Sequence, residues 1–243
     1  MILWTSWFHI KDEEHRNEVL RSIELNLENP HIEKLKLLCE IDFLYEHPKL
    51  ECIKLTERPT YQTFTDMFDP DQINTIANSD IVFDYDSSTL INQIKPNSAY
   101  CITRYQLESD YKLPLSEWKG TYWQKLCGLS QDAWVIYKPT NKIIADLFPG
   151  ILGCEGRFCY SLYQAGIKLF NKGPSIKTFH VHSSKERNYP FDYLHQNYPA
   201  IRVQQEAERK YRWSSTFVTR TIWFTPNIFS EHFPQGKWFA LDY

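Results

Sequence analysis

The sequence lacks an excess of charge of either sign. Its 243 residues carry 27 basic and 30 acidic side chains, and the formal net charge is −3. These values exclude a disordered tail, a collagen-like repeat and a strongly basic nucleic-acid-binding arm. Because 42% of the residues are hydrophobic, we expect one large domain, which at this length buries about 70% of its extended surface.

The sequence also lacks a long apolar run. The apolar segment 1–8 has no basic residues before it and is followed by His9, Lys11 and Asp12, so it matches neither a signal peptide nor a membrane span. No later segment approaches the roughly 18 apolar residues that indicate a transmembrane helix. We therefore predict a soluble protein without a transmembrane segment. The aromatic residues at 223–224 and 238–239 leave a membrane or partner contact open.

Paired cysteines are absent as well. The six cysteines are scattered without Cys-x-x-Cys pairs, a pattern typical of reduced, buried thiols in a full-sized domain. Cys154 and Cys159 have no second pair nearby that would complete a zinc site. No internal repeat, low-complexity tract or Gly/Ser linker divides the chain.

Apolar runs and helical periods alternate along the first part of the chain, which favours an α/β protein with a parallel sheet. Asp12 is a predicted N-cap for a helix over Glu14–Leu27, and a second helix begins at Glu155, with Gly166 as its C′ residue. Strands are expected at Ile2–Phe8, Leu35–Cys39, Glu51–Leu55, Ile73–Ala77, Ile81–Phe83, Ala99–Ile102, Trp134–Tyr137, Ile167–Phe170 and Ile176–Val181. Residues 206–212 read as helical, and the last thirty residues are left unassigned.

The segment Asn78-Ser79-Asp80 follows a predicted buried strand directly. Ligands of open α/β sheets bind at the carboxyl ends of strands. Oxygen-bearing side chains one residue apart at such a point can hold Mg²⁺ or Mn²⁺, which in turn holds a diphosphate. The similar segment 84–86 comes soon after, and most such segments are simply turns or solvated surface.

Two further groups carry possible chemistry. His180 and His182 share one face of a predicted strand, so either can complete a metal site or contact phosphate, although such pairs are more often structural. Glu155 opens a helix, where a carboxylate serves as a capping charge. If Glu155 faces a cleft, the same group can act as a general base.

Several ordered blocks together resemble the small GT-A glycosyltransferases found in large DNA viruses and in bacterial surface-polysaccharide gene clusters. They read ANSDIVFD at 77–84, TRY at 103–105, SQDAW at 130–134, GCEGR at 153–157 and SIKTFHVH at 175–182. The resemblance implies one GT-A, Rossmann-like nucleotide-diphospho-sugar transferase domain over residues 1–185 with a mostly parallel sheet. Residues 186–243 would then form a helical and aromatic extension packed on this core.

The resemblance also implies a UDP-, GDP- or dTDP-linked sugar donor, a glycan acceptor and a bound Mn²⁺ or Mg²⁺. Asp80 is then the main metal ligand, with His180 or His182 completing the shell. The predicted donor-binding residues are Thr5, Ser6, Trp7, Asn78, Ser79, Arg104 and Asp132. The expected location is the cytoplasm, or the host cytoplasm if the protein is viral.

Inverting relatives carry an acidic base in the block matched by 153–157, which makes Glu155 the predicted catalytic residue. Many of them have Asp-Asn-Arg where this chain has Glu155-Gly156-Arg157, so the base here is one methylene longer. We expect a metal-dependent glycosyltransferase that inverts the anomeric centre. The alternatives are a retaining transferase, a metal-dependent hydrolase or nucleotidyltransferase, and a carbohydrate-binding module that stacks its aromatic residues on sugars.

Overall fold

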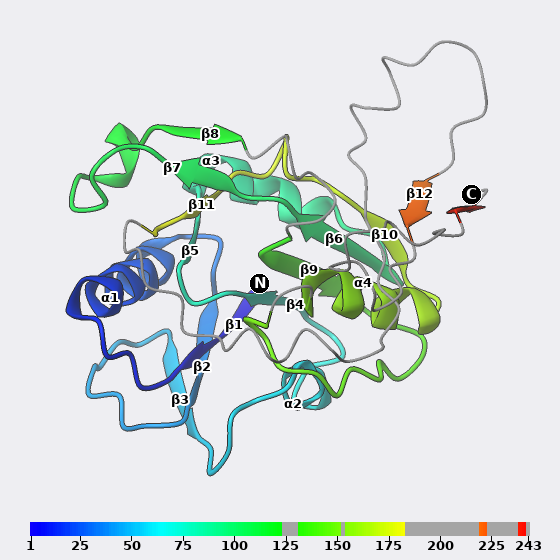
Figure 1. The fold of residues 1–243 in the computed structure, drawn as a ribbon, viewed down its shortest axis with the longest axis horizontal. Helices are drawn as coiled ribbons and strands as arrows, with labels where there is room; N and C mark the ends of the chain where they lie inside the picture. Colours follow the sequence, from blue (N-terminus) through cyan, green and yellow to red (C-terminus); the bar gives the residue numbers. More distant parts are fainter. Residues whose placement is uncertain (123–130, 152–153, 183–218, 223–237, 242–243) are drawn as a thin grey trace, which may run out of the picture.

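The central element of the fold is a seven-stranded, mostly parallel sheet (Figure 1). The computed structural model describes residues 1–122, 131–151 and 154–182, and the strand backbones at 219–222 and 238–241. The strands of this sheet are β1 (Ile2–Trp7), β2 (Lys34–Cys39), β3 (Leu50–Lys54), β4 (Ile73–Ala77), β6 (Ser98–Ile102), β9 (Ala133–Tyr137) and β10 (Lys168–Phe170). Their order is β10-β6-β9-β4-β1-β2-β3, and only β9 runs against its neighbours. The predicted α/β class is confirmed.

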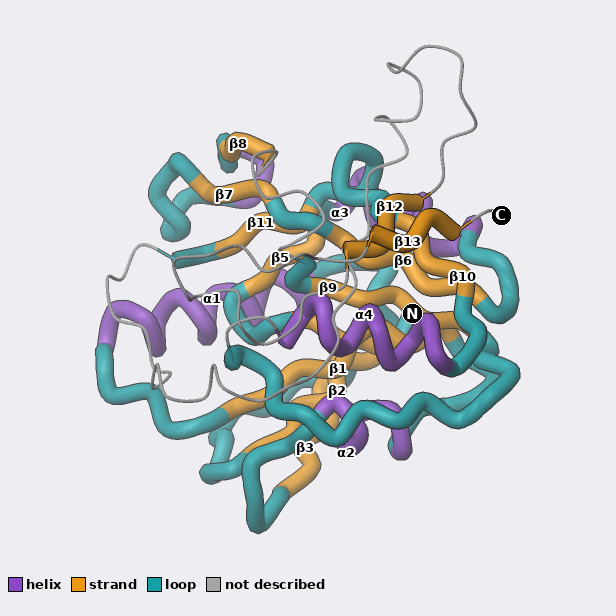
Figure 2. The backbone as a smooth tube through the Cα atoms, turned by 45° about the vertical axis from the view of Figure 1, so that its right-hand side comes forward, coloured by secondary structure: helices purple, strands orange, loops and turns teal. Residues whose placement is uncertain are grey.

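Helices cover both faces of this sheet. They are α1 (Glu13–Glu28), α2 (Tyr61–Asp66), α3 (Tyr85–Ser88) and α4 (Cys154–Gln164), with short 3₁₀ turns at Thr89–Gln93 and Leu115–Glu117. One core cluster joins Leu3 of β1 to Val19 and Ile23 of α1. A second cluster joins Trp4 of β1 to Phe158 of α4. Neighbouring residues of a strand point to opposite faces, so α1 and α4 pack on opposite sides of the sheet (Figure 2).

A smaller sheet stands beside the central one. It contains β5 (Ile81–Phe83), β7 (Tyr105–Leu107), β8 (Gly120–Tyr122) and β11 (Thr178–His180) in the order β5-β11-β7-β8. Only residues 78–80 separate β4 of the large sheet from β5 of the small one. The turn predicted to carry chemistry therefore lies where the chain crosses from one sheet to the other.

Most predicted elements are confirmed, with small shifts at their ends. Asp12 caps α1 by accepting a hydrogen bond from the His15 backbone NH, and Gly166 takes a left-handed φ of 77° after α4. The strand predicted at Ile176–Val181 is shorter, because β11 pairs with β5 and β7 only over 178–180. The helices α2 and α3 and the strands β7 and β8 were not predicted.

The C-terminal part of the chain is described only at two strands, β12 (Thr219–Ile222) and β13 (Trp238–Leu241), which pair antiparallel. They fall within the last thirty residues, which the sequence left unassigned. The helix predicted at 206–212 and the rest of the predicted extension lie outside the described residues. Among the described helices, none is long and apolar enough to cross a membrane.

Candidate metal and catalytic cleft

A cleft of about 380 Å³ opens at the carboxyl edge of the central sheet. Its walls come from the ends of β1, β2, β4 and β6, from the beginning of β9 and of α4, and from α1 and β11. The predicted site residues that line it are Ser6, Asn78, Ser79, Asp80, Arg104, Asp132, Glu155, His180 and His182. Residues from six separate blocks of sequence are thus brought to one concave surface, where ligand sites of α/β sheets form.

Thr5 and Trp7, the other two predicted donor-binding residues, do not line this cleft. Both are buried, with exposures of 4% and 6%, and the Trp7 ring packs edge-on against Phe43 at 4.9 Å between centroids. The physical reason is strand alternation, which turns Ser6 to the opposite face from Thr5 and Trp7. Of these three residues, only Ser6 is placed to touch a ligand in the cleft.

Asp80 lies in the tight connection between β4 and β5. The Ile81 backbone NH donates to the Asn78 carbonyl at 3.2 Å, and the Val181 NH donates to the Asp80 carbonyl at 2.8 Å. These bonds hold the carboxylate next to β11, where its Oδ2 lies 3.1 Å from Nε2 of His180. Its other oxygen, Oδ1, is buried and has no hydrogen-bond partner among the described residues.

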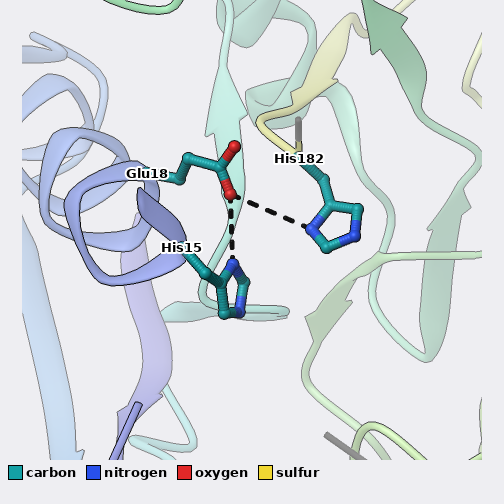
Figure 3. Close-up of side chains that lie close together, drawn as sticks. All are labelled: His15, Glu18 and His182. Atoms are coloured by element: carbon teal, nitrogen blue, oxygen red, sulfur yellow. Dashed lines mark hydrogen bonds and ion pairs between the residues drawn. The ribbon is translucent and has the colours of Figure 1, made fainter. Parts of the chain in front are cut away.

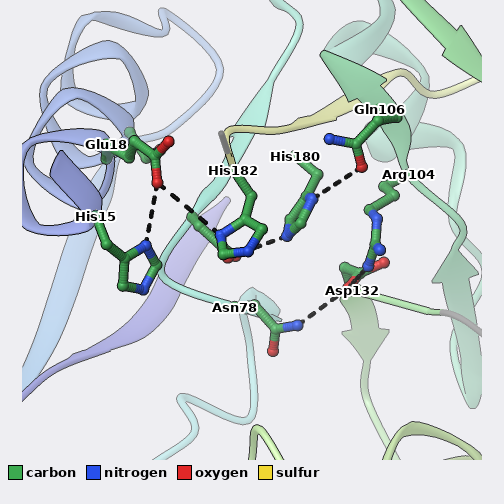
Figure 4. A network of polar contacts seen from close by, with 10 residues as sticks. His15, Glu18, Asn78, Arg104, Gln106, Asp132, His180 and His182 are labelled. Carbon is green, nitrogen blue, oxygen red and sulfur yellow. Dashed lines mark hydrogen bonds and ion pairs between the residues drawn. The ribbon is translucent and has the colours of Figure 1, made fainter. Parts of the chain in front are cut away.

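His180 is oriented from behind by Gln106. Nδ1 of His180 lies 3.1 Å from Oε1 of Gln106 (Figure 4). A carbonyl oxygen only accepts, so Nδ1 donates to Gln106 and Nε2 faces Asp80. An outer hydrogen bond of this kind orients the ring of a metal-binding histidine. Asp80, His180 and His182 each offer a ligand atom, and all three atoms lie within 4.8 Å of one another.

The surroundings of Asp80 favour its charged form. Burial alone would raise the pKa of this carboxyl, but the charges of His180 and Arg104 and the His180 hydrogen bond lower the pKa well below its usual range. Asp80 is therefore an anion at any physiological pH. A buried anion with one unpartnered oxygen has the chemistry of a cation ligand.

Arg104 links the two walls of the cleft. Its guanidinium Nη1 donates to Oδ1 of Asp132 at 2.7 Å, and the Asn78 amide donates to the same oxygen at 3.1 Å. The Asp132 side chain is only 2% exposed. Burial lowers the pKa of Arg104, but Asp132 and Asp80 outweigh it and raise the pKa overall. The three side chains thus form a charged network that fixes the Asn78 amide (Figure 4).

The environment of Glu155 shifts its pKa in the opposite direction to that of Asp80. It belongs to the first turn of α4 and lines the cleft. Burial and the nearby negative charge of Asp132 raise its pKa to about 7, although Arg104 acts in the other direction. A carboxyl group that titrates near neutral pH can exchange a proton with a bound substrate under physiological conditions.

Two polar residues of α1, one in the cleft lining and one behind it, escaped sequence reasoning. His15 lines the cleft, and Glu18, one turn further along, is completely buried behind it. In the sequence they read as polar positions of an amphipathic helix. The only available signal was their spacing of three residues, which places both on one helix face.

The segment Asp84-Tyr85-Asp86 does not contribute to the cleft lining. Asp84 instead caps α3 by accepting a hydrogen bond from the Ser87 backbone NH at 3.0 Å. This corresponds to the turn interpretation that the sequence left open for such segments.

Comparisons with known proteins do not assign this chain to a family. No family profile matches the chain, and no curated protein matches it. Among solved structures, the 2-C-methyl-D-erythritol 4-phosphate cytidylyltransferase of Francisella tularensis is similar, with 11% sequence identity and a TM-score of 0.41. The match covers 79% of this chain and 95% of that one. A likeness at this level assigns neither an activity nor a ligand to this chain.

Proposed function

We propose that this chain is a metal-dependent glycosyltransferase of the GT-A kind, which moves a sugar from a nucleotide-diphosphate donor to a hydroxyl group of a glycan or other acceptor with inversion. One observation carries the proposal. Two carboxyl groups in the same cleft have pKa values shifted in opposite directions, that of Asp80 downward and that of Glu155 up to about 7. Such divergence separates an ionic ligand from a group that moves protons.

The Asp80 side of the cleft suits a divalent cation. Asp80 supplies an anionic oxygen without a hydrogen-bond partner among the described residues, and His180 and His182 supply imidazole nitrogens. Two nitrogen ligands suit Mn²⁺ better than Mg²⁺, which prefers oxygen ligands and bound water. When bound there, the cation would neutralise the charge that grows on the departing diphosphate.

The Glu155 side supplies the proton acceptor. The acceptor hydroxyl oxygen forms a bond to the anomeric carbon while the bond from that carbon to the diphosphate oxygen breaks on the opposite face. The hydroxyl proton passes to the Glu155 carboxylate, a contribution of about 10²- to 10⁴-fold in rate. With its pKa at about 7, Glu155 is ionised enough to accept the proton and basic enough to hold it.

Arg104 and Asn78 complete the polar surface between the two carboxyl groups. Both donate to Asp132 and line the cleft, so their remaining polar atoms are positioned by a fixed network rather than by the ligand. Preorganised donors of this kind stabilise developing charge without reorganising during the reaction. We assign them, together with Ser6, Ser79 and Asp132, to the sugar and diphosphate of the donor.

The test is a titration of UDP-, GDP- and dTDP-sugars with and without Mn²⁺, followed by transfer assays and determination of the anomeric configuration of the product. We expect one donor class to bind in a Mn²⁺-dependent way and to yield a product of inverted configuration. Retained configuration would remove Glu155 as the base. Free sugar released at the full rate without acceptor would indicate a hydrolase, and a nucleotide joined to the acceptor would indicate a nucleotidyltransferase. Sugar binding that needs neither nucleotide nor metal would indicate a binding module.

A further inference from the structure

A second group of potential ligands lies behind the Asp80 site, at the junction of α1 and the end of β11. His15 and Glu18 come from α1, and His182 comes from the segment that follows β11 (Figure 3). Each offers a ligand atom, and the three atoms lie within 4.8 Å of one another. Oε2 of Glu18 is 3.1 Å from Nδ1 of His15 and 3.9 Å from Nδ1 of His182.

The side chains of this group are more deeply buried than those of an ordinary polar cluster on the surface. The Glu18 side chain is 0% exposed, and those of His15 and His182 are 11% and 18% exposed. The two imidazole rings lie perpendicular, with centroids 5.4 Å apart. Buried carboxylates are paired with cations or bind metals, because an isolated buried charge is costly.

The hydrogen bonds within this group leave one nitrogen unsatisfied. Nδ1 of His182 is buried and has no hydrogen-bond partner among the described residues. Its 3.9 Å separation from Glu18 is too long for a hydrogen bond, which requires about 3.2 Å or less. Two ligands of one tetrahedral Zn²⁺ lie roughly 3.3 Å apart, given bonds of about 2.0–2.1 Å. The observed separations of 3.1 and 3.9 Å bracket that value.

We propose that His15, Glu18 and His182 form a second cation site, one that can take Zn²⁺ and that is distinct from the Asp80 site. Two imidazoles and one carboxylate are a zinc ligand set that leaves a fourth position open. His15 and His182 line the cleft, so the open position faces it. Because Nδ1 of His182 faces Glu18 (Figure 3), this site uses Nδ1 and leaves Nε2 for the neighbouring site. The proposal does not depend on the transferase function.

The test starts from the purified full chain stripped of metal with a chelator. Zn²⁺ affinity is then measured by competition with a chromophoric chelator in the wild type and in variants. We expect Glu18→Gln and His15→Gln to weaken Zn²⁺ binding at least about 100-fold, since even supporting residues of such sites contribute about 10- to 100-fold. Asp80→Asn, which alters the neighbouring site, should change the affinity less than about threefold, a ceiling set well below that range.

A second control variant and a second measurement exclude misfolding and nonspecific binding as explanations of the result. His47→Gln changes a half-buried histidine outside both ligand groups, so it reports weak binding by histidines elsewhere and should have no effect. Circular dichroism and thermal unfolding establish that each variant folds, and His15→Gln carries the test if Glu18→Gln does not. In the wild type and in both controls, but not in Glu18→Gln or His15→Gln, Co²⁺ should give the intense visible absorption of a tetrahedral site, which Zn²⁺ then removes.

The outcomes separate this site from the proposed function. The zinc site is overturned if Glu18→Gln and His15→Gln bind Zn²⁺ as the wild type does, or if bound Co²⁺ gives only the weak spectrum of an octahedral ion. Equal loss of Zn²⁺ binding in Asp80→Asn and Glu18→Gln would also overturn it, because that result means one shared site. The transferase proposal is tested instead by Mn²⁺-dependent donor binding, which this experiment does not use.

Discussion

The two walls of the cleft shift the pKa of a carboxyl group in opposite directions. On one wall, Asp80 is next to His180 and within the field of Arg104, and its pKa is lowered despite burial. On the other wall, Glu155 is next to Asp132 and has no directly bonded cation among the described residues, and burial raises its pKa to about 7. The same residue chemistry therefore gives a permanent anion in one place and a proton acceptor in the other.

The comparison shows that one ion pair contributes to the different roles of the two carboxyl groups. Arg104 acts on both carboxyl groups, but its direct bond goes to Asp132. Asp132 in turn is the neighbour that raises the pKa of Glu155. A single ion pair thus supports both walls, and breaking one member of this set should affect the two walls unequally.

Removing the proton acceptor should have the largest effect. Glu155→Gln keeps the shape of the side chain but cannot take a proton, so turnover should fall by about 10²- to 10⁴-fold. Mn²⁺-dependent donor binding, measured by calorimetry, should stay within a factor of about two, because no step of binding needs that proton. Glu40→Gln, which changes another acid lining the same cleft, is the matched control and should cost less than tenfold. Near-wild-type turnover in Glu155→Gln would remove the base assignment.

Removing the anionic ligand should have the second-largest effect on turnover. Asp80→Asn should lower turnover by about 10²- to 10³-fold, because the stabilisation of leaving-group charge would be lost. Unlike the previous variant, it should also abolish the Mn²⁺ dependence of donor binding. Asp86→Asn changes an exposed acid in the nearby segment and should behave as wild type. Donor affinity that still responds to Mn²⁺ in Asp80→Asn would contradict the ligand assignment.

Breaking the shared ion pair should affect folding. Arg104→Met leaves the Asp132 carboxylate, 2% exposed, without its directly bonded cation. Removing one partner of a buried pair costs about 3 kcal/mol or more in the free energy of unfolding. The double variant Arg104→Met/Asp132→Asn should recover part of that loss in urea titrations, because no charge is then stranded. A double variant less stable than either single one would mean that the pair is not coupled.

Glu155→Gln should also stabilise the protein at high pH. The pKa of Glu155 in the folded chain is about 7, above its ordinary value of 4.5, so folding becomes less favourable as the pH rises through this window. The variant should therefore exceed the wild type by about 2 kcal/mol at pH 8, allowing for screening, and match it near pH 4. Urea unfolding at both pH values measures the difference. A constant difference at both would show that proton binding is not its source.

The smallest expected effect is a shift in the pH profile. In the wild type, kcat/KM should rise through an inflection near pH 7 as Glu155 loses its proton. Asp132→Asn removes a negative charge that raises this pKa, so the inflection should move to lower pH. An unchanged inflection would assign the titration to another group.

The parts of this molecule that sequence predicted well are those set by local rules. Asp12 caps α1, and the apolar run before Asn78 forms β4, because capping and strand burial depend on a few neighbouring residues. Asn78 and Asp80 reach the cleft because they follow the carboxyl end of β4, at the edge that the parallel strands share.

What sequence missed depends on long-range placement. His15 and Glu18 look like ordinary helix positions until α1 is packed against the end of β11. The shift of the Glu155 pKa needs Asp132, which is 23 positions earlier in the chain. Thr5 and Trp7 were a local error, since strand alternation already separates them from Ser6.

The reversed direction of β9 has a consequence for how variation is tolerated here. Every other strand of the central sheet presents its end at this edge, whereas β9 presents its start, at Asp132. Ala133, the next residue, pairs with Ala77 on one side and Ile102 on the other. A slip of one residue in either ladder would turn Asp132 away and leave Arg104 and Asn78 without their common anchor. The loops around the cleft can therefore vary in sequence more freely than the register of β9 can change.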